Sequence, residues 1–105
     1  MKEWKPCSNE AITLIHEAGY IDYVEKKWFV DNGYVGGDTY VTRHTPKAAK
    51  LAVQGVLLSV DKVMSGEWNS GFAFVRPPGH HADMEGEPCG FCTYSNVAIG
   101  AKYAL

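Results

Sequence analysis

The sequence predicts an α/β fold in which helices flank a parallel sheet, and three features indicate it. Residues 46–65 carry apolar side chains at helical spacing along one broad face. Residues 72–75 (Phe-Ala-Phe-Val) form a short, wholly apolar run, which is typical of a strand covered on both faces. A long polar loop separates this run from a further helical pattern at 97–105, which Ser95 or Asn96 can cap. The order of helix, strand, loop and helix is one part of an α/β layer.

The N-terminal part of the chain predicts two short helices and a short strand. Ser8 or Asn9 can cap the first helix, and Gly19 is placed to end it. The second helix is predicted over 20–29, where apolar residues recur at helical spacing. A glycine-rich loop then precedes a short strand at 39–42.

The longest predicted helix has clear start and stop signals. Thr45 fits the N-cap, and Pro46 fits the first helical position, where the absent N–H of proline costs nothing. Gly66 is placed to end the helix. Gly55 inside the helix costs about 1 kcal/mol relative to alanine, which indicates a closely packed neighbour.

Length and composition limit the function classes. A chain of 105 residues is enough for one domain, and 46% hydrophobic with 12% aromatic residues argues against disorder. Ten basic against twelve acidic residues give a net charge of -2, which excludes the basic surface of a non-specific nucleic-acid binder. No apolar run is long enough for a membrane span, residues 1–6 do not resemble a secretory signal, and three cysteines are too few for a disulfide scaffold. We therefore expect an intracellular protein, in the nucleus, the cytoplasm or both.

The loop after the predicted strand carries the main candidates for chemistry. In open α/β sheets, ligands bind beyond the carboxyl ends of the strands, and His80 and His81 follow such an end. Pro77, Pro78 and Gly79 restrict the backbone directly before them. Because histidine titrates near neutral pH, a rigidly held pair is suited to general acid–base catalysis.

Spacing alone leaves other interpretations open. A histidine pair also occurs in solvated loops, and acidic side chains nearby could form a metal site, although none of the usual zinc spacings is present. Cys89 and Cys92 have the C-x-x-C spacing of a thiol redox pair, but a long polar loop separates them from the predicted strand. His16 and His44 are expected to be structural or solvated, and Cys7 to have no role in the chemistry.

Three motifs together resemble the zinc-dependent histone deacetylase family. They are the run Gly-Phe-Ala-Phe-Val-Arg-Pro-Pro-Gly-His-His-Ala at 71–82, Gly-Phe-Cys at 90–92 and Asn-Val-Ala-Ile at 96–99. The Arg-Pro-Pro-Gly-His-His form is similar to the class II branch and to bacterial acetylpolyamine amidohydrolases. Segments at 14–21 and 38–66 also match, so the resemblance covers nearly all of the chain.

The resemblance implies the arginase/deacetylase fold and hydrolysis of the N-acetyl-lysine amide in a histone or another protein. Hydrolysis of an acetylpolyamine is the more remote alternative. In the family, zinc polarises the acetyl carbonyl and acidifies a water molecule. His81 matches the general base that takes the proton of this water. His80 matches the residue that stabilises charge and assists proton transfer to the leaving amine.

The same resemblance implies a substrate pocket around the histidine pair. Gly90 and Phe91 match residues that line the tunnel for the acyl-lysine side chain. Cys92 matches a residue near the tunnel floor that does not bind the metal. Pro78 and Gly79 are expected beside this pocket.

The metal ligands of the family have no counterpart in this sequence. They belong to an Asp-x-Asp-x-His motif beyond the helix that begins near Asn96, and no Asp-x-His occurs in the chain. The ligands are therefore expected downstream of Leu105, the last residue of the sequence. We expect residues 1–105 to be the incomplete N-terminal part of a single catalytic domain, truncated after the histidine-pair loop and the start of the next helix. Alone, such a chain is expected to bind no catalytic zinc, to be inactive and to expose apolar surface.

The expected partners follow from this resemblance. The complete domain would act on an acetyl-lysine protein substrate, without direct contact to nucleic acid or membrane. The chain would pair with the missing portion of the domain or with other corepressor subunits. A non-catalytic binding or regulatory module is the alternative function, and a thiol redox protein is a third.

Overall fold

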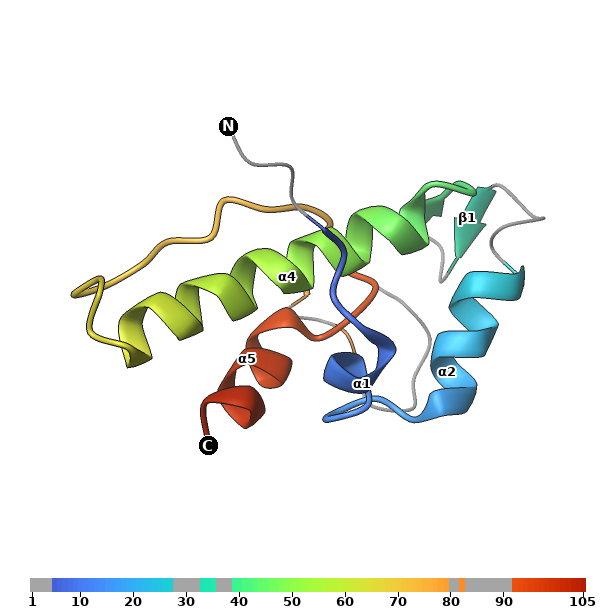
Figure 1. The fold of residues 1–105 in the computed structure, drawn as a ribbon. Coiled ribbons are helices and arrows are strands. Elements are labelled where there is room, and N and C mark those ends of the chain that lie inside the picture. The colour runs from blue at the N-terminus through green and yellow to red at the C-terminus, as the bar shows by residue number, and fades with distance from the viewer. Residues whose placement is uncertain (1–4, 28–32, 36–38, 80–81, 83–91) are drawn as a thin grey trace.

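The computed structural model describes residues 5–27, 33–35, 39–79, 82 and 92–105 (Figure 1). The helices of this part are α1 (Asn9–Ile12), α2 (Ala18–Asp22), which a π-helical turn (Tyr23–Lys27) continues, α4 (Thr45–Met64) and α5 (Asn96–Ala104). Helix α4 is a long rod, and the shorter helices lie below it in the view of Figure 1. The chain therefore builds its core against a single long helix.

Helix α1 begins at a predicted local signal, but the predicted signal for its end is wrong. The Ser8 Oγ accepts a hydrogen bond from the Ala11 N–H at 3.3 Å, which confirms the predicted N-cap. Helix α1 ends at Ile12, earlier than predicted, and the following turn buries both Ile12 and His16. Gly19 was predicted to end this helix, and that prediction is wrong, because Gly19 lies inside α2. The C-cap residue of α1 is Thr13, not a glycine.

Helix α4 has nearly the predicted bounds. Gly66 follows it with a φ of 82°, the left-handed conformation expected of a glycine that ends a helix. The N-cap is His44 rather than the predicted Thr45. The Thr45 Oγ1 instead accepts a hydrogen bond from the Thr42 N–H at 2.9 Å, in the turn before the helix. Neither α4 nor any other helix in the described part is long and apolar enough to cross a membrane.

Helix α5 confirms the helical pattern predicted for the last residues of the sequence, with slightly different bounds. It begins at Asn96 and ends at Ala104, whereas the prediction placed it over 97–105. Leu105 is the C-cap residue, and its N–H donates to the Lys102 carbonyl at 3.3 Å. The Leu105 side chain is fully exposed, so it contributes no apolar contact to the core.

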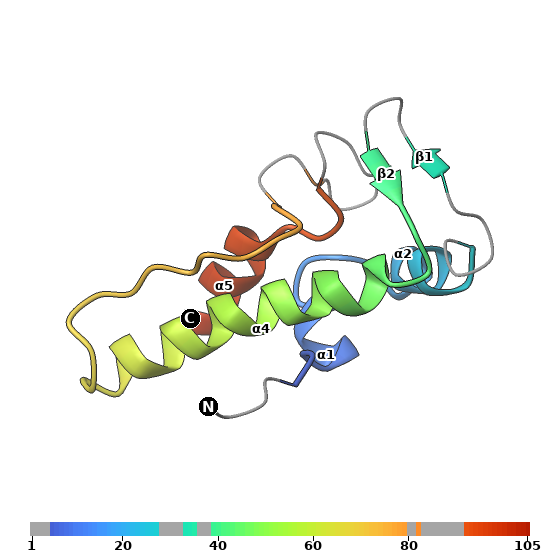
Figure 2. The ribbon, with the colours of Figure 1, turned by 90° about the horizontal axis from the view of Figure 1, so that it is seen from above.

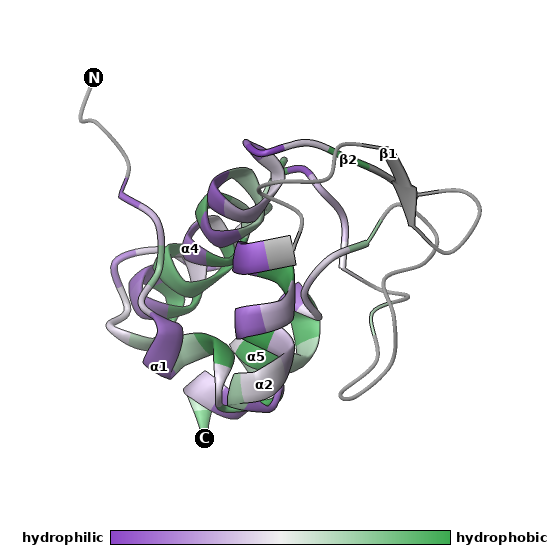
Figure 3. Ribbon diagram, turned by 90° about the vertical axis from the view of Figure 1, so that its right-hand side faces the viewer, coloured by the Kyte–Doolittle hydropathy of each residue, from purple (hydrophilic) through white to green (hydrophobic). Residues whose placement is uncertain are grey.

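The core lies between α4 and the shorter helices. Helix α4 buries the face that carries Ala49, Ala52 and Val53. Helix α5 packs along α4 (Figure 2), and Gly100 permits this approach, because a Cβ atom there would lie 2.7 Å from the Val56 Cγ1. Hydrophilic and hydrophobic stretches alternate around the helices, as expected for amphipathic elements (Figure 3). The core residues are Cys7, Ile12, Tyr20, Ile21, Val24, Val41, Ala49, Val53, Leu57, Tyr94 and Ile99.

The C-terminal half of α4 is only partly covered. Val63 is 37% exposed and Met64 is 68% exposed, although the sequence pattern placed both on the apolar face. A groove of about 410 Å³ lies between this half of α4, the end of α5 and the segment 71–73. It is lined by Val56, Ser59, Val60, Val63, Met64, Gly71, Ala73 and Ala104. Part of the apolar face of α4 therefore lacks a partner in the described part of the chain.

The described residues contain a single two-stranded sheet, formed by β1 (Gly33–Val35) and β2 (Thr39–Val41). The two strands are antiparallel, with Gly33 opposite Val41, Tyr34 opposite Tyr40 and Val35 opposite Thr39. Strand β2 confirms the short strand predicted at this place. The parallel sheet predicted for the fold is not found among the residues that the structure describes.

The apolar segment 72–75 differs from its prediction. It runs extended beside α4 (Figure 2) but pairs with no strand in the described part of the chain. Phe72 is 86% exposed and Phe74 is 96% exposed. The prediction of a strand buried on both faces was therefore wrong for this chain, because burial needs neighbouring strands and a covering layer. The predicted exposure of apolar surface is confirmed.

Candidate active-site scaffold

Part of the predicted site lies in the described residues. Pro78 is partly buried, Gly79 is buried, and Cys92 has 0% of its surface exposed. The remaining predicted residues lie outside the described part: His80, His81, Gly90 and Phe91. Their roles stay predictions. What the structure shows is how the two ends of the segment 80–91 are held.

The described residues before and after this segment lie against each other. A Cβ atom added to Gly79 would lie 2.5 Å from the Asn96 backbone nitrogen and 2.8 Å from the Asn96 Cγ, and it would overlap the Tyr94 carbonyl oxygen. The Asn96 Nδ2 also donates a hydrogen bond to the Pro77 carbonyl at 3.3 Å. Only glycine leaves room for this contact, which gives a steric reason for a glycine directly before the histidine pair.

Two side chains from the N-terminal region hold the second end. The Tyr20 hydroxyl donates to the Thr93 carbonyl at 2.6 Å, and the Ser95 N–H donates to the His16 Nε2 at 2.9 Å. These bonds join residues that are 73 and 79 positions apart in the sequence. Both bonds engage the backbone of 93–95, so they restrain the path of the chain itself.

An aromatic cluster surrounds these hydrogen bonds. The His16 and Tyr20 rings stack with centroids 5.0 Å apart, and the Tyr94 ring lies 6.0 Å from Tyr20 in an edge-on arrangement. Burial raises the pKa of the Tyr94 phenol well above its usual range, and the Glu25 carboxylate acts in the same direction. The phenol of Tyr94 is therefore a neutral core group at physiological pH.

The sequence indicated these anchors only in part. His16 was predicted to be either structural or solvated, and its 2% exposure confirms the structural role. The helical spacing of apolar residues marked Tyr20 as inward-facing, but it carried no information about a partner 73 positions away. Tyr94 was not predicted to have any role, because it follows a loop and belongs to no periodic pattern.

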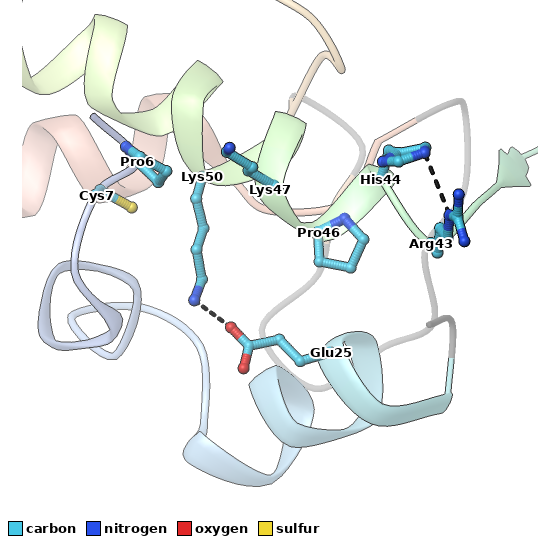
Figure 4. Close-up of a pocket in the computed structure, with 8 residues that line it drawn as sticks. All are labelled: Pro6, Cys7, Glu25, Arg43, His44, Pro46, Lys47 and Lys50. Atoms are coloured by element: carbon cyan, nitrogen blue, oxygen red, sulfur yellow. Dashed lines mark hydrogen bonds and ion pairs between the residues drawn. The ribbon is translucent and has the colours of Figure 1, made fainter. Parts of the chain in front are cut away.

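A separate hollow of about 510 Å³ lies beside the start of α4 (Figure 4). Lys50 reaches across it from α4 and forms an ion pair with Glu25. Burial raises the pKa of the Cys7 thiol to about 11, while the Lys50 charge acts in the opposite direction. The hollow is lined by Pro6, Cys7, Glu25, Arg43, His44, Pro46, Lys47 and Lys50. None of the described site residues lines it.

The described residues do not fit a zinc site. Within this part of the chain, no group of three or more His, Cys, Asp or Glu side chains could hold a metal ion. The sequence as a whole contains no Asp-x-His. Metal ligands were predicted downstream of Leu105, which places them outside these 105 residues, and their position stays a prediction. Cys89 lies outside the described residues, so the C-x-x-C redox interpretation also stays a prediction.

Comparison with known proteins points to one family. The model of the histone deacetylase domain matches residues 1–105. Histone deacetylase 10, chloroplastic, from Oryza sativa subsp. japonica is 36% identical over 99% of this chain, which is 26% of that protein's length. Polyamine deacetylase HDAC10 from Mus musculus is 36% identical over 92% of this chain and 15% of its own length.

A solved structure supports the match at the level of the fold. The crystal structure of the HDA15 HD domain superimposes on 98% of this chain with a TM-score of 0.89 at 29% sequence identity, and the match covers 29% of that chain. This chain therefore spans less than a third of the Oryza relative and of the solved domain. Because the family model matches every residue from 1 to 105, the chain belongs to the histone deacetylase family.

Proposed function

We propose that this chain supplies the histidine loop and part of the substrate tunnel of an N-acetyl-lysine deacetylase domain. The match of the histone deacetylase model to residues 1–105 is the observation that carries the proposal. The close contact between Gly79 and Asn96 supports it, because a catalytic loop needs fixed ends to place its side chains reproducibly.

The two histidines would divide the proton transfers of amide hydrolysis. His81 would act as the general base that takes the proton of the attacking water. His80 would stabilise the developing charge and assist proton transfer to the leaving lysine amine. A side chain that titrates near neutral pH can perform either step, because it can both accept and return a proton.

The tunnel residues would bind the substrate by contact with its aliphatic stem. Phe91 would offer an aromatic wall, and Gly90 would let the backbone approach the acyl-lysine side chain. Cys92, which is fully buried, would lie near the floor of this tunnel. The substrate class would be an acetylated protein, with an acetylated polyamine as the alternative.

We derive no step through a metal, because the described side chains form no group that could hold a metal ion and the sequence contains no Asp-x-His. We propose that the zinc of the family's reaction is held by residues other than these 105, downstream of Leu105 in a complete domain. The 105-residue chain tested alone is then expected to be inactive.

A chimera tests the proposed reaction. In it, these 105 residues replace the matching segment of the Oryza relative, which provides the remainder of the domain. We expect the chimera to release acetate from an acetyl-lysine peptide, and the relative without this segment to release none. The intact relative is the positive control, and parallel assays with an acetylated polyamine separate the two substrate classes. A folded chimera without turnover of either substrate would contradict the proposed function.

A binding role is the second candidate, and the exposed segment 72–75 favours it. The rings of Phe72 and Phe74 stack with centroids 6.4 Å apart, and both side chains are almost fully exposed to solvent. Exposed apolar surface of this kind is typical of a docking site. Co-expression of the tagged chain with the truncated Oryza relative tests this role. Co-purification without turnover would favour a binding module, and a lack of association would contradict it.

A further inference from the structure

The proposed chemistry depends on the placement of residues 80–91, and the structure shows what holds the two ends of this segment. Reacting groups need close positioning, since a displacement of about 1 Å can lower a rate by about 100-fold. Gly79 directly precedes His80, and Cys92 directly follows Phe91. Contacts that restrain the backbone beside Gly79 and Cys92 therefore also restrict the segment between them.

Two neighbouring side chains restrain the backbone on either side of Tyr94. The buried His16 accepts the Ser95 N–H at its Nε2, 2.9 Å away. The Tyr20 ring stacks on this imidazole, and its hydroxyl donates to the Thr93 carbonyl at 2.6 Å. A buried hydrogen bond at Thr93 and a partly buried one at Ser95 leave the backbone between them little freedom, because breaking either bond loses a contact in a largely desolvated place.

The same restraint reaches the first end of the segment. Asn96 directly follows Ser95 and donates its side-chain N–H to the Pro77 carbonyl at 3.3 Å. The backbone of Asn96 also forms the wall against which Gly79 packs. A continuous set of contacts therefore runs from His16, through Ser95 and Asn96, to Gly79.

We propose that His16 and Tyr20 are positioning residues of the deacetylase site. They restrain the backbone at 93–95, which packs through Asn96 against Gly79, and turnover of the complete domain depends on this restraint. This inference rests on the proposed function. Two experiments distinguish a wrong positioning role from a wrong deacetylase function.

Hydrogen exchange of the Ser95 amide in the 105-residue chain tests the restraint without any activity. His16→Gln keeps a hydrogen-bond acceptor near the position of the Nε2, whereas His16→Leu removes it at similar volume. We expect slow exchange in the parent chain and in His16→Gln, and exchange at least about tenfold faster in His16→Leu. Ile12→Val is the control, because Ile12 lies in the same core but its side chain cannot form a hydrogen bond. Equal exchange in all four proteins would overturn the proposal.

Steady-state kinetics of the chimera test the link to catalysis. At a temperature where all variants are folded, His16→Leu should lower kcat by about tenfold or more. His16→Gln should restore it to within about threefold, and Ile12→Val should leave it unchanged. If His16 has a purely structural role, His16→Leu should lower the free energy of unfolding and leave kcat unchanged. That outcome in an active chimera would overturn the proposal. If the parent chimera has no turnover, the proposed function fails, and the Ser95 exchange rates still decide whether His16 restrains the segment.

Discussion

Replacement of Gly79 by alanine should destabilise the chain, because the site has no room for a methyl group. The added Cβ would lie 2.5 Å from the Asn96 nitrogen and 2.8 Å from the Asn96 Cγ. Favourable contacts between such atoms need roughly 3.5 Å, and the Tyr94 carbonyl oxygen lies closer still, so the two segments must separate by at least roughly 1 Å. Overpacking of this kind costs about 1–3 kcal/mol. The lower flexibility of alanine in the unfolded chain offsets about 0.4–1 kcal/mol of that cost. The middle of these two ranges gives an expected net loss in the free energy of unfolding of about 1–2 kcal/mol.

Thermal unfolding followed by circular dichroism measures this loss. For a domain of this size, about 1 kcal/mol corresponds to about 4–8 °C, so Gly79→Ala should lower Tm by roughly 5–15 °C. Gly19→Ala is the matched control, because Gly19 lies inside α2 and no atom outside its own stretch of helix lies within 4 Å of its added Cβ. This control should gain up to about 1 kcal/mol from the higher helix propensity of alanine. An unchanged Tm in Gly79→Ala would refute the steric argument, as would an equal fall in Gly19→Ala.

The remaining predictions concern one hydrogen bond, one thiol and one exposed surface. Tyr20→Phe removes the donor to the Thr93 carbonyl and should lower the free energy of unfolding in urea by about 1–3 kcal/mol; an unchanged value would contradict a structural role for this bond. Burial raises the pKa of Cys7 from 9.0 to about 11, so the unfolded chain ionises first. Below pH 9 the neutral thiol gives its full stabilisation, and the free energy of unfolding relative to Cys7→Ala should fall as pH rises to 11, by at most about 2 kcal/mol because solvent screens part of the effect; parallel pH profiles would contradict this. Phe72→Asp combined with Phe74→Asp should change stability by less than about 0.5 kcal/mol, since both rings are exposed, and should reduce co-purification with the truncated Oryza relative. Unchanged co-purification would argue against a docking surface at 72–75.

The parts of the fold that depend on local signals could be predicted from the sequence. The Ser8 cap acts on its own helix, and Gly66 ends α4 through its own positive φ. Neither needs a distant partner, so the pattern of residues was sufficient. The short strand β2 was predicted for the same reason, because turn residues and a brief β-favouring run mark it.

The parts that depend on distant partners could not be predicted in this way. The apolar run 72–75 has the composition of a buried strand, but burial is a property of the surrounding layers, and the described residues supply only one side. Gly19 is compatible with a helix end and with a helix interior, and in the structure it lies inside α2. Composition shows which structures a segment can adopt, and the contacts with the rest of the fold determine which one forms.

The candidate site was likewise predictable where local motifs mark it and unpredictable where distant residues meet. The sequence motifs placed Pro78, Gly79 and Cys92 next to a pocket, and the structure brings the segments that contain Gly79 and Cys92 together. The hydrogen bonds from Tyr20 and His16 could not be read from the sequence, because each spans more than seventy residues.

The rate of acetate release from an acetyl-lysine peptide by the chimera and by its His81→Ala variant tests the central claim most directly. If His81 is the general base, the variant should lose about 10²–10⁴-fold in kcat and still bind the peptide. A chimera that turns over the peptide at the same rate with and without His81 would contradict the assignment of this loop as the catalytic part of the chain.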